Sequence, residues 1–325
     1  MRKLLFSTIC IVLFSTIFTA CDNTVQLNIS AGANGSVDTT ANGRYSYGSI
    51  ITITATADEG FSFVGWNDGN TENPRTITVG KADIELTATF ADPNTVDLGL
   101  PSGTLWAKRN VGAKYPWNYG NYYAWGETRT KRYYTGNSYT FFNFNGGTGC
   151  INGSITKYCY NHRGNFGKNG YIDNLIILLP TDDAATINWG TNYQMPTEPD
   201  FEELINHCYW VWTNDYDGHG VKGFIVYKAK SDSEKGVKVK EDDMLSSAYS
   251  LYDVHIFLPA AGQRVNSNLC FDNEHCEYWT SSLYNKSYNE GPAYARAFDN
   301  YNDINTYIYN CERYCGLSVR PIRRK

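Results

Sequence analysis

The sequence predicts an α+β fold, in which a small all-β module precedes a larger domain with two helices. Apolar residues occupy every second position in residues 51–57 (ITITATA) and 84–90 (IELTATF), the period of a strand with one buried face. Residues 197–208 instead show the spacing of a helix with one apolar side. Aromatic residues make up 15% of the chain and charged residues 19%, a balance typical of a well-packed, β-rich extracellular protein.

The length and charge of the chain limit the classes of protein to consider. At 325 residues it has room for two or three domains. The net charge is −5, and no block of Lys or Arg could follow a phosphate backbone, so we expect no nucleic-acid partner. Residues 323–325 (RRK) are too few to change this expectation and predict a solvated tail.

Residues 1–20 have the pattern of a secretory signal peptide. Two basic residues precede an apolar run from Leu4 to Phe18, which is too short for a comfortable membrane span. The run leads into residues 18–21 (FTAC), which resemble the bacterial lipoprotein box. We therefore expect a lipid on Cys21 that anchors an outer-membrane lipoprotein, exposed at the cell surface, although Asp22 leaves the choice of leaflet open. The alternative is an ordinary secretory signal with Cys21 as an unmodified thiol.

Residues 21–91 form the expected all-β module. Asn34-Gly35, Asn42-Gly43 and Asp68-Gly69 are turn signals between its short strands. The order of these patterns, with residues 60–66 (GFSFVGW) as the most specific part, resembles the divergent internalin-type B-repeat of bacterial surfaces. The resemblance implies a spacer or, in some cases, an adhesive unit. Residues 66–68 (WND) also spell a calcium-ligand triplet of C-type lectins, but they stand at a strand end before a glycine, so we interpret them as a turn.

A short linker at residues 92–94 (DPN) opens a larger domain that spans residues 92–325. One helix is expected to begin after Thr181-Asp182-Asp183 and to run toward Trp189. In the other, Thr197 is the cap, Asp200 closes a capping box, and the core-facing residues are Phe201, Leu204, Ile205 and Cys208. Strands are expected within residues 99–112, 210–212, 224–227 and 256–259. Residues 128–171 predict a long loop, and residues 228–247 a solvated hairpin or loop.

Several motifs of this domain, taken in order, resemble the Fibrobacter succinogenes major paralogous domain, which is common in surface lipoproteins of the Bacteroidota. The resemblance covers roughly residues 96–322, with Tyr193-Gln194 as a departure where the family usually has Trp-Arg. It implies a C-type-lectin-like fold, with a mixed sheet that is antiparallel at its centre, two helices and long loops, related to the formylglycine-generating enzymes. The motifs are WAKRNVGA (106–113), YGNYYAWGE (119–127), INWG (187–190), MPTEPDFEELINHCYWVW (195–212), IFLPAAG (256–262), YWTSS (278–282) and GLSVRP (316–321).

Nine cysteines are present, and two of them lie in or at the end of the signal peptide. Three close pairs predict disulfides in an oxidising compartment, namely Cys150 with Cys159, Cys270 with Cys276, and Cys311 with Cys315. Cys208 is expected to be a buried thiol on a helix. Metal ligation by Cys270, His275 and Cys276 is an alternative that lacks a fourth ligand and the usual spacing.

No motif of the chain points to catalysis. There is no Gly-x-Ser-x-Gly, no His pair at metal spacing and no P-loop, so we expect neither an enzyme nor a cofactor. Residues 198–200 (EPD) resemble a sugar-specificity triplet of calcium-dependent lectins, but their place in a capping sequence favours a structural role, and no metal is expected. An enzyme of the formylglycine-generating type, with copper on Cys311 and Cys315, is the alternative.

The segment between YWTSS and GLSVRP is the best candidate for function, because it is rich in Tyr and Asn and poor in aliphatic residues. In residues 305–311 (NTYIYNC), Thr306 and Ile308 share one strand face and Tyr307 and Tyr309 the other, so a core-facing Ile308 would expose the two tyrosines. Ala295 and Ala297 similarly leave Tyr294, Arg296 and Phe298 on the opposite face. The predicted ligand-binding residues are Tyr284, Asn285, Tyr288, Tyr294, Tyr301, Asn302, Tyr307 and Tyr309.

The sequence therefore predicts a surface lipoprotein that recognises a glycan or a protein outside the cell. A further hypothesis is that a retroelement that mutates adenines diversifies this segment. Two alternatives stay open for the function. One is a structural component of the envelope or of a pilus-like assembly, in which the tyrosines only cover the sheet. The other is the copper enzyme.

Overall fold

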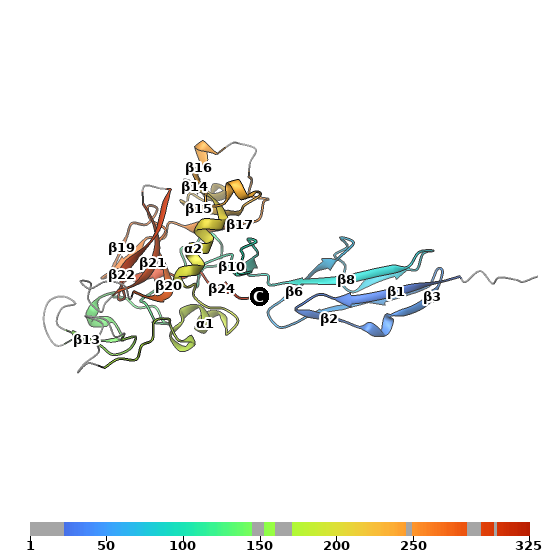
Figure 1. Cartoon of the computed structure of the whole chain (residues 1–325), viewed down its shortest axis with the longest axis horizontal. Helices are drawn as coiled ribbons and strands as arrows, with labels where there is room; N and C mark the ends of the chain where they lie inside the picture. The colour runs from blue at the N-terminus through green and yellow to red at the C-terminus, as the bar shows by residue number, and fades with distance from the viewer. Residues whose placement is uncertain (1–22, 145–152, 160–170, 245–248, 285–293, 302–303) are drawn as a thin grey trace, which may run out of the picture. The chain divides into compact units, whose positions relative to one another are not determined.

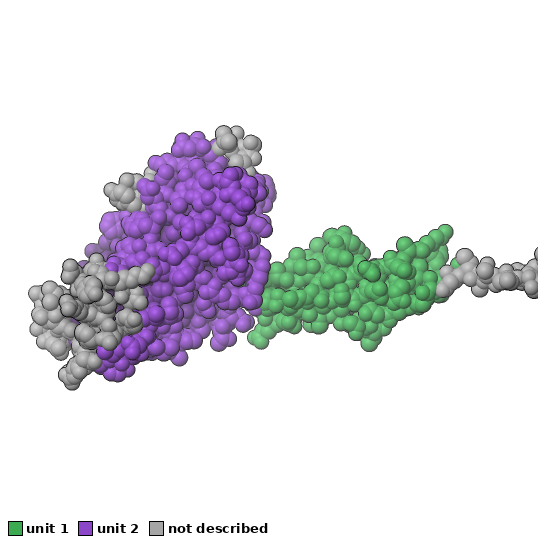
Figure 2. All heavy atoms as spheres, viewed as in Figure 1, with its two compact units in different colours: residues 1–93 green, residues 94–325 purple. Residues whose placement is uncertain are grey.

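The chain forms two compact units, residues 1–93 and 94–325 (Figure 2). The structure, a computed structural model, describes residues 23–144, 153–159, 171–244, 249–284, 294–301 and 304–325. Expectations for the signal peptide, Cys21 and Cys150 lie outside the described residues. Within the described residues the fold is mostly β with two α-helices, as expected for an all-β module followed by a β-rich domain. None of the described helices is both long and apolar enough to cross a membrane.

The N-terminal unit is built from short strands around one apolar core. A four-stranded sheet has the order β3-β1-β8-β6, and the pairs β2-β5 and β4-β7 complete the unit (Figure 1). In β1 and β8 every second residue is buried, as the alternation in residues 84–90 predicts. The strands are β1 (Thr24–Ala31), β2 (Gly35–Val37), β3 (Gly43–Ser46), β4 (Ile50–Ile53), β5 (Ala55–Ala57), β6 (Ser62–Trp66), β7 (Arg75–Thr78) and β8 (Ile84–Ala91), with a 3-10 turn at Thr39–Ala41.

Residues 66–69 form a turn after β6, as predicted, and they do so through their side chains. Both carboxylate oxygens of Asp68 accept hydrogen bonds from Arg75, at 2.8 and 2.6 Å. The indole of Trp66 is buried and donates to the Glu72 carbonyl at 3.0 Å. Trp66 and Asp68 thus hold the turn through these bonds, which is the structural role that the sequence predicts for residues 66–68.

The C-terminal unit holds several small sheets and one large one. The strands are β9 (Thr95–Val96), β10 (Leu105–Ala107), β11 (Tyr122–Tyr123), β12 (Phe142–Phe144), β13 (Gly153–Ile155), β14 (Cys208–Thr213), β15 (Gly223–Lys228), β16 (Lys238–Lys240), β17 (His255–Pro259), β18 (Gln263–Val265), β19 (Asn268–Cys270), β20 (Tyr278–Leu283), β21 (Tyr294–Tyr301), β22 (Asn305–Glu312), β23 (Gly316–Ser318) and β24 (Ile322–Arg323). The helices are α1 (Ala184–Trp189) and α2 (Glu198–His207), with 3-10 turns at Gly136–Ser138, Pro180–Asp182, Tyr216–Gly218, Asp232–Glu234 and Glu241–Asp243.

The large sheet has the order β19-β18-β23-β20-β21-β22, with β11 also paired to β23 (Figure 1). It is mixed, because β20 and β23 run parallel while the other pairs are antiparallel. Its strands β20 and β21 carry apolar residues on both faces. Tyr278 and Phe298 pack in a core with α2, whereas Trp279 and Ala297 pack in a second core that includes Trp125. The centre of this sheet is therefore covered on both sides.

Helix α2 begins and faces the core as the sequence predicts. Asp200 Oδ2 accepts hydrogen bonds from the backbone N–H and the hydroxyl of Thr197, at 2.8 and 2.6 Å, which is the expected capping box. Arg324 donates two further bonds to the same carboxylate, at 2.6 and 2.8 Å. Phe201 and Leu204 are fully buried, and the free thiol of Cys208 is buried at the end of the helix. The structural interpretation of residues 198–200 is thus confirmed.

The two ends of the C-terminal segment, residues 278–282 and 316–321, make hydrogen bonds that join distant parts of the unit. Tyr278 donates from its hydroxyl to the Pro259 carbonyl at 2.9 Å, and the Trp279 indole donates to the Tyr123 carbonyl at 2.7 Å. The guanidinium of Arg320 is fully buried and donates to the carbonyls of Ala107 and Phe257, at 2.9 and 2.6 Å. Because a guanidinium carries several donors in a fixed plane, one side chain joins segments far apart in the sequence.

Two segments expected to be loops contain strands. Residues 128–171 hold β12 and β13, which pair antiparallel, and residues 228–247 hold β16, which pairs in parallel with β14. Neither segment has an alternating apolar pattern long enough to predict a strand. In each case the strand forms through hydrogen bonds to a partner strand, so its own sequence gives little indication that it is a strand.

Candidate functional site

Among the residues expected to bind a ligand, those that the structure describes do not form one surface. Tyr284 and Tyr294 flank the connection between β20 and β21, whereas Tyr301 and Tyr307 lie at the other end of β21. An eight-residue strand at about 3.3 Å per residue separates these ends by roughly 23 Å. Asn285, Tyr288 and Asn302 lie outside the described residues, as does the side chain of Tyr301.

Tyr307 and Tyr309 share one face of β22, as expected, but they are not exposed as a pair. Ile308 does pack against the core that contains α2. Tyr307 is 40% exposed, and its ring lies edge-on to that of Tyr309, with centroids 6.1 Å apart. Tyr309 instead packs against the second core, and its hydroxyl is buried. The expectation of an exposed Tyr309 is wrong, because the sheet has a core on both of its faces.

The surface expected around Tyr294, Arg296 and Phe298 is largely covered. Phe298 is fully buried and stacks on Phe201 of α2, with centroids 4.9 Å apart. Arg296 donates to Glu198 at 2.7 Å and to Asn310 at 2.6 Å, and its guanidinium lies over the ring of Tyr284. Tyr284 and Tyr294 are half-buried. Helix α2 therefore takes the position that a ligand would need on this face.

A different group of side chains meets at the Tyr307 end of the sheet. In the register of the strands, Tyr278 is opposite Phe298 and Asp299 is opposite Tyr307, so Glu277, Asp299 and Tyr307 form a row on one face. The Tyr307 hydroxyl donates to Asp299 Oδ2 at 3.0 Å. His275 Nδ1 lies 3.1 Å from Asp299 Oδ1 and 3.9 Å from Glu277 Oε1.

We call Phe271, His275, Glu277, Asp299 and Tyr307 the carboxylate–aromatic patch. Its outer members are accessible, since Phe271 is 47% exposed and the His275 side chain 27% exposed. The rings of Phe271 and His275 have centroids 5.1 Å apart. The patch thus joins two exposed aromatic rings through a layer of polar groups, within reach of a ligand in solvent.

The carboxylates of the patch are held in an unusual electrostatic state. Burial raises the pKa of Glu277 to about 8, and the nearby charge of Asp299 adds to the rise, while the Tyr309 hydroxyl lowers it. Burial also raises the pKa of Asp299, although His275 and the hydrogen bonds from Asn300 and Tyr307 oppose the rise. Perturbed carboxylates of this kind gather at functional sites more often than elsewhere.

Sequence reasoning missed His275, Glu277 and Asp299 as a group. A signal was present, because His275 and Glu277 are two residues apart just before a predicted strand, and an extended chain turns them to one side and Cys276 to the other. Cys276 indeed points away, and its thiol donates to the Leu258 carbonyl. Asp299 could not be added without the register of β20 and β21, which residues 284–294 do not specify.

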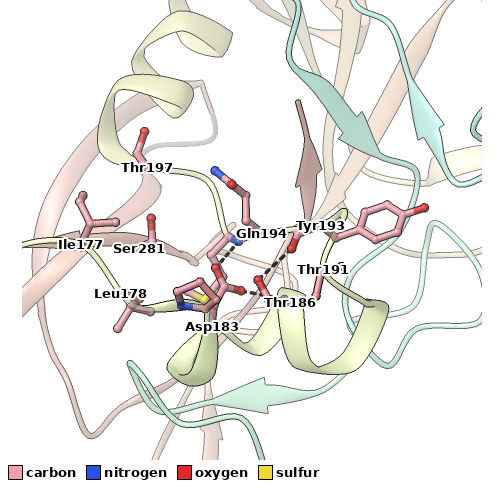
Figure 3. Close-up of a pocket in the computed structure, with 11 residues that line it drawn as sticks. Ile177, Leu178, Asp183, Thr186, Thr191, Tyr193, Gln194, Thr197 and Ser281 are labelled. Carbon is pink, nitrogen blue, oxygen red and sulfur yellow. Dashed lines mark hydrogen bonds between the residues drawn. The ribbon is translucent and has the colours of Figure 1, made fainter. Parts of the chain in front are cut away.

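A hollow of the C-terminal unit, distinct from the carboxylate–aromatic patch, lies beside α1 and has a volume of about 280 Å³ (Figure 3). Its floor is set by Asp183, which accepts hydrogen bonds from the backbone N–H groups of Thr186 and Met195, at 2.9 and 2.8 Å. The Thr186 hydroxyl donates to the Tyr193 carbonyl at 2.8 Å. These polar groups are engaged in capping α1 and fixing the chain after it, so they leave few free donors or acceptors for a ligand.

The cysteines of the described residues are present as thiols. Cys270 and Cys276 are unbonded, as are Cys311 and Cys315, so the structure lacks the two disulfides predicted for them. Cys270 and Cys276 belong to segments that diverge, since Cys276 turns to Leu258 while β19 pairs with β18. Cys311 and Cys315 do lie close together, with ligand atoms of Cys311, Glu312 and Cys315 all within 4.8 Å. Cys159 is buried, and its expected partner Cys150 is outside the described residues.

The fold of the N-terminal unit defines a small all-β module of the kind found as repeats. Residues 25–94 match the family described as the divergent InlB B-repeat domain, which confirms the resemblance seen in the sequence. A domain of the B-repeat type suggests a surface or cell-envelope protein. The chain has no match among curated proteins or among solved structures.

Proposed function

We propose that this chain is a lipid-anchored surface protein whose C-terminal unit binds a ligand outside the cell, without catalysing a reaction. The single observation that carries the proposal is the carboxylate–aromatic patch, in which buried Asp299 contacts both exposed Tyr307 and His275, and His275 packs against exposed Phe271. The B-repeat module supports the location, because it suggests a surface or cell-envelope protein.

The chemistry of the patch suits a glycan better than the other candidate, a protein. A sugar presents an apolar C–H face, which stacks on an aromatic ring, and hydroxyl groups, which bond to carboxylates and imidazole. Tyr307 and Phe271 offer the rings, and His275, whose side chain is partly exposed, offers a polar group that buried Asp299 holds at 3.1 Å. The ring of Tyr307 is ordered by its own hydrogen bond, so binding costs little side-chain entropy.

A C-type-lectin-like fold for the C-terminal unit belongs to the same proposal. What supports it is the combination of a mixed sheet, two helices and internal roles for the sequence motifs, such as the buried Arg320 of GLSVRP. The rival copper enzyme would rely on Cys311 and Cys315. Both thiols are buried, so copper on this pair would lie away from solvent.

Glycan-array binding of the chain from residue 22 onward tests the proposal. We expect Tyr307→Ala and Phe271→Ala each to weaken binding by about tenfold, since a lost aromatic contact is worth about 1.4 kcal/mol. Tyr252→Ala is the matched control, because Tyr252 is fully exposed and forms no part of the patch. If wild type and both patch variants bind the same glycans and host-surface proteins equally well, recognition at this patch is refuted.

A further inference from the structure

The carboxylate–aromatic patch contains a compact set of metal-ligand atoms. One ligand atom each from His275, Glu277 and Asp299 lies within 4.8 Å of the others. The backbone brings them together from two places, since His275 and Glu277 precede β20 while Asp299 comes from β21. An imidazole nitrogen with two carboxylate oxygens is a donor set that first-row divalent cations accept.

The spacing of these atoms is close to that of a coordinated ion. Ligand atoms about 2.1 Å from a tetrahedral zinc ion are about 3.4 Å from one another. His275 Nδ1 is 3.1 Å from Asp299 Oδ1 and 3.9 Å from Glu277 Oε1, so the distances lie on either side of that value. Small rotations of the side chains would bring all three atoms to one ion.

A second observation is that the deepest carboxylate is incompletely bonded. Glu277 is only 2% exposed, and Gln263 donates to its Oε1 at 3.3 Å. Its Oε2 atom has no partner at hydrogen-bond distance, and the Tyr309 hydroxyl, which is buried near the Glu277 carboxylate, has none either. A buried carboxylate oxygen without a partner is costly, and such atoms are rare in folded proteins. A cation bound to the Glu277 carboxylate would compensate for this missing bond.

The charges around the site also favour a bound cation. Among the described residues, the only cationic side chain within ion-pair distance of Glu277 and Asp299 is His275. Two buried carboxylates share one imidazole, so a bound cation would supply the positive charge that allows both carboxylates to ionise. His275 is partly exposed, which provides an entry path for an ion from solvent.

We propose that His275, Glu277 and Asp299 form a binding site for a first-row divalent metal ion, Zn²⁺ or Mn²⁺. The Tyr307 hydroxyl, hydrogen-bonded to Asp299, then serves as the outer partner that orients this ligand. Three protein ligands leave a further coordination position for solvent or another oxygen donor. Metal binding here does not depend on the proposed glycan binding, and the two proposals are tested by separate experiments.

Isothermal titration calorimetry of the untagged chain, freed of metal with a chelator, tests this site with Zn²⁺ and Mn²⁺. We expect one ion per chain and a rise in the temperature of unfolding with the bound ion. Glu277→Gln and Asp299→Asn keep the side-chain shapes and should each weaken binding by at least tenfold. Asp97→Asn is the control, because Asp97 is a surface carboxylate paired with Lys325.

Two further measurements separate this site from its competitors. The double variant Cys311→Ser with Cys315→Ser should retain the full affinity and stoichiometry, and Co²⁺ bound to the wild type should show no thiolate-to-metal absorption band. His275→Gln, at a partly exposed position that tolerates change, should also lose at least tenfold in affinity. The proposal is overturned if neither ion binds or stabilises the wild type, or if binding survives Glu277→Gln but is lost with the two thiols.

Discussion

Glu277 shows how a single buried carboxylate sets the properties of its surroundings. Its position before β20 directs the side chain beneath Tyr307 and beside Asp299, where water is excluded. Burial and the neighbouring carboxylate favour the protonated acid, which is why the pKa rises to about 8. The same side chain would be ionised on binding a cation, so proton and metal compete for it.

The pH dependence of unfolding measures this effect in the metal-free chain. The pKa of Glu277 is about 8 in the folded state and about 4.3 when unfolded, so the folded state holds the proton more tightly. The stability this provides is complete below pH 4.3 and is lost as the pH rises toward 8, by up to about 1.4 kcal/mol per pH unit.

Glu277→Gln should remove this loss. We expect the variant to resemble wild type at pH 5 and to be more stable than wild type at pH 8, when urea unfolding is followed in the presence of a chelator. Asp299 and His275 are present in both proteins, so the difference between the two curves reports on the ionisation of Glu277 and on its coupling to Asp299. Parallel curves for the two proteins from pH 5 to pH 8 would show that Glu277 is not a buried acid.

At the scale of elements, α2 illustrates a structure that is specified locally. Its cap, first turn and apolar side all stand in residues 197–208, and the structure follows them. Asp200 has a double role, because it closes the capping box and receives Arg324 from the end of the chain. The helix covers the face of β21 that carries Phe298.

Asp200→Asn should destabilise the C-terminal unit by about 1–3 kcal/mol, because it weakens the cap and leaves Arg324 without its charged partner. The unfolding midpoint in urea, followed by tryptophan fluorescence, measures this loss. Glu202→Gln is the control on the same helix, since Glu202 is exposed. An equal midpoint for the two variants would contradict the structural role of residues 198–200.

The sequence predicts elements where the signal is local and fails where it depends on partners. The strand β8 and the helix α2 carry their own periodicity, and both were predicted. The strand β16 has only its pairing with β14, and it was taken for part of a hairpin or loop. Alternation placed Tyr309 on the correct face of β22, but it could not reveal that a second core covers that face. Joining Asp299 to Glu277 likewise requires the strand register.

At the scale of the whole molecule, the chain combines an all-β module of the B-repeat type with a larger β-rich unit. The two units have separate cores, so each can be considered by itself. Such a chain suits a surface location, with the proposed ligand site in the C-terminal unit and the proposed lipid anchor ahead of the B-repeat module. The anchor rests on residues 18–21 of the sequence.

Replacement of Cys21 tests the anchor. We expect Cys21→Ser to move the protein from the membrane fraction to the soluble fraction and to abolish incorporation of labelled fatty acid, because the acylated thiol is lost. Cys10→Ser, within the apolar run of the signal peptide, is the control and should leave both readouts unchanged. Membrane retention and labelling in Cys21→Ser would contradict a lipid on this residue.

The central claim is that the C-terminal unit recognises its ligand at the carboxylate–aromatic patch. A crystal structure of the chain with a glycan selected on the array tests this claim most directly. We predict a sugar ring against Tyr307 and Phe271, with a hydroxyl bonded to His275. A sugar bound instead in the hollow beside Asp183, with the patch left to solvent, would contradict the claim.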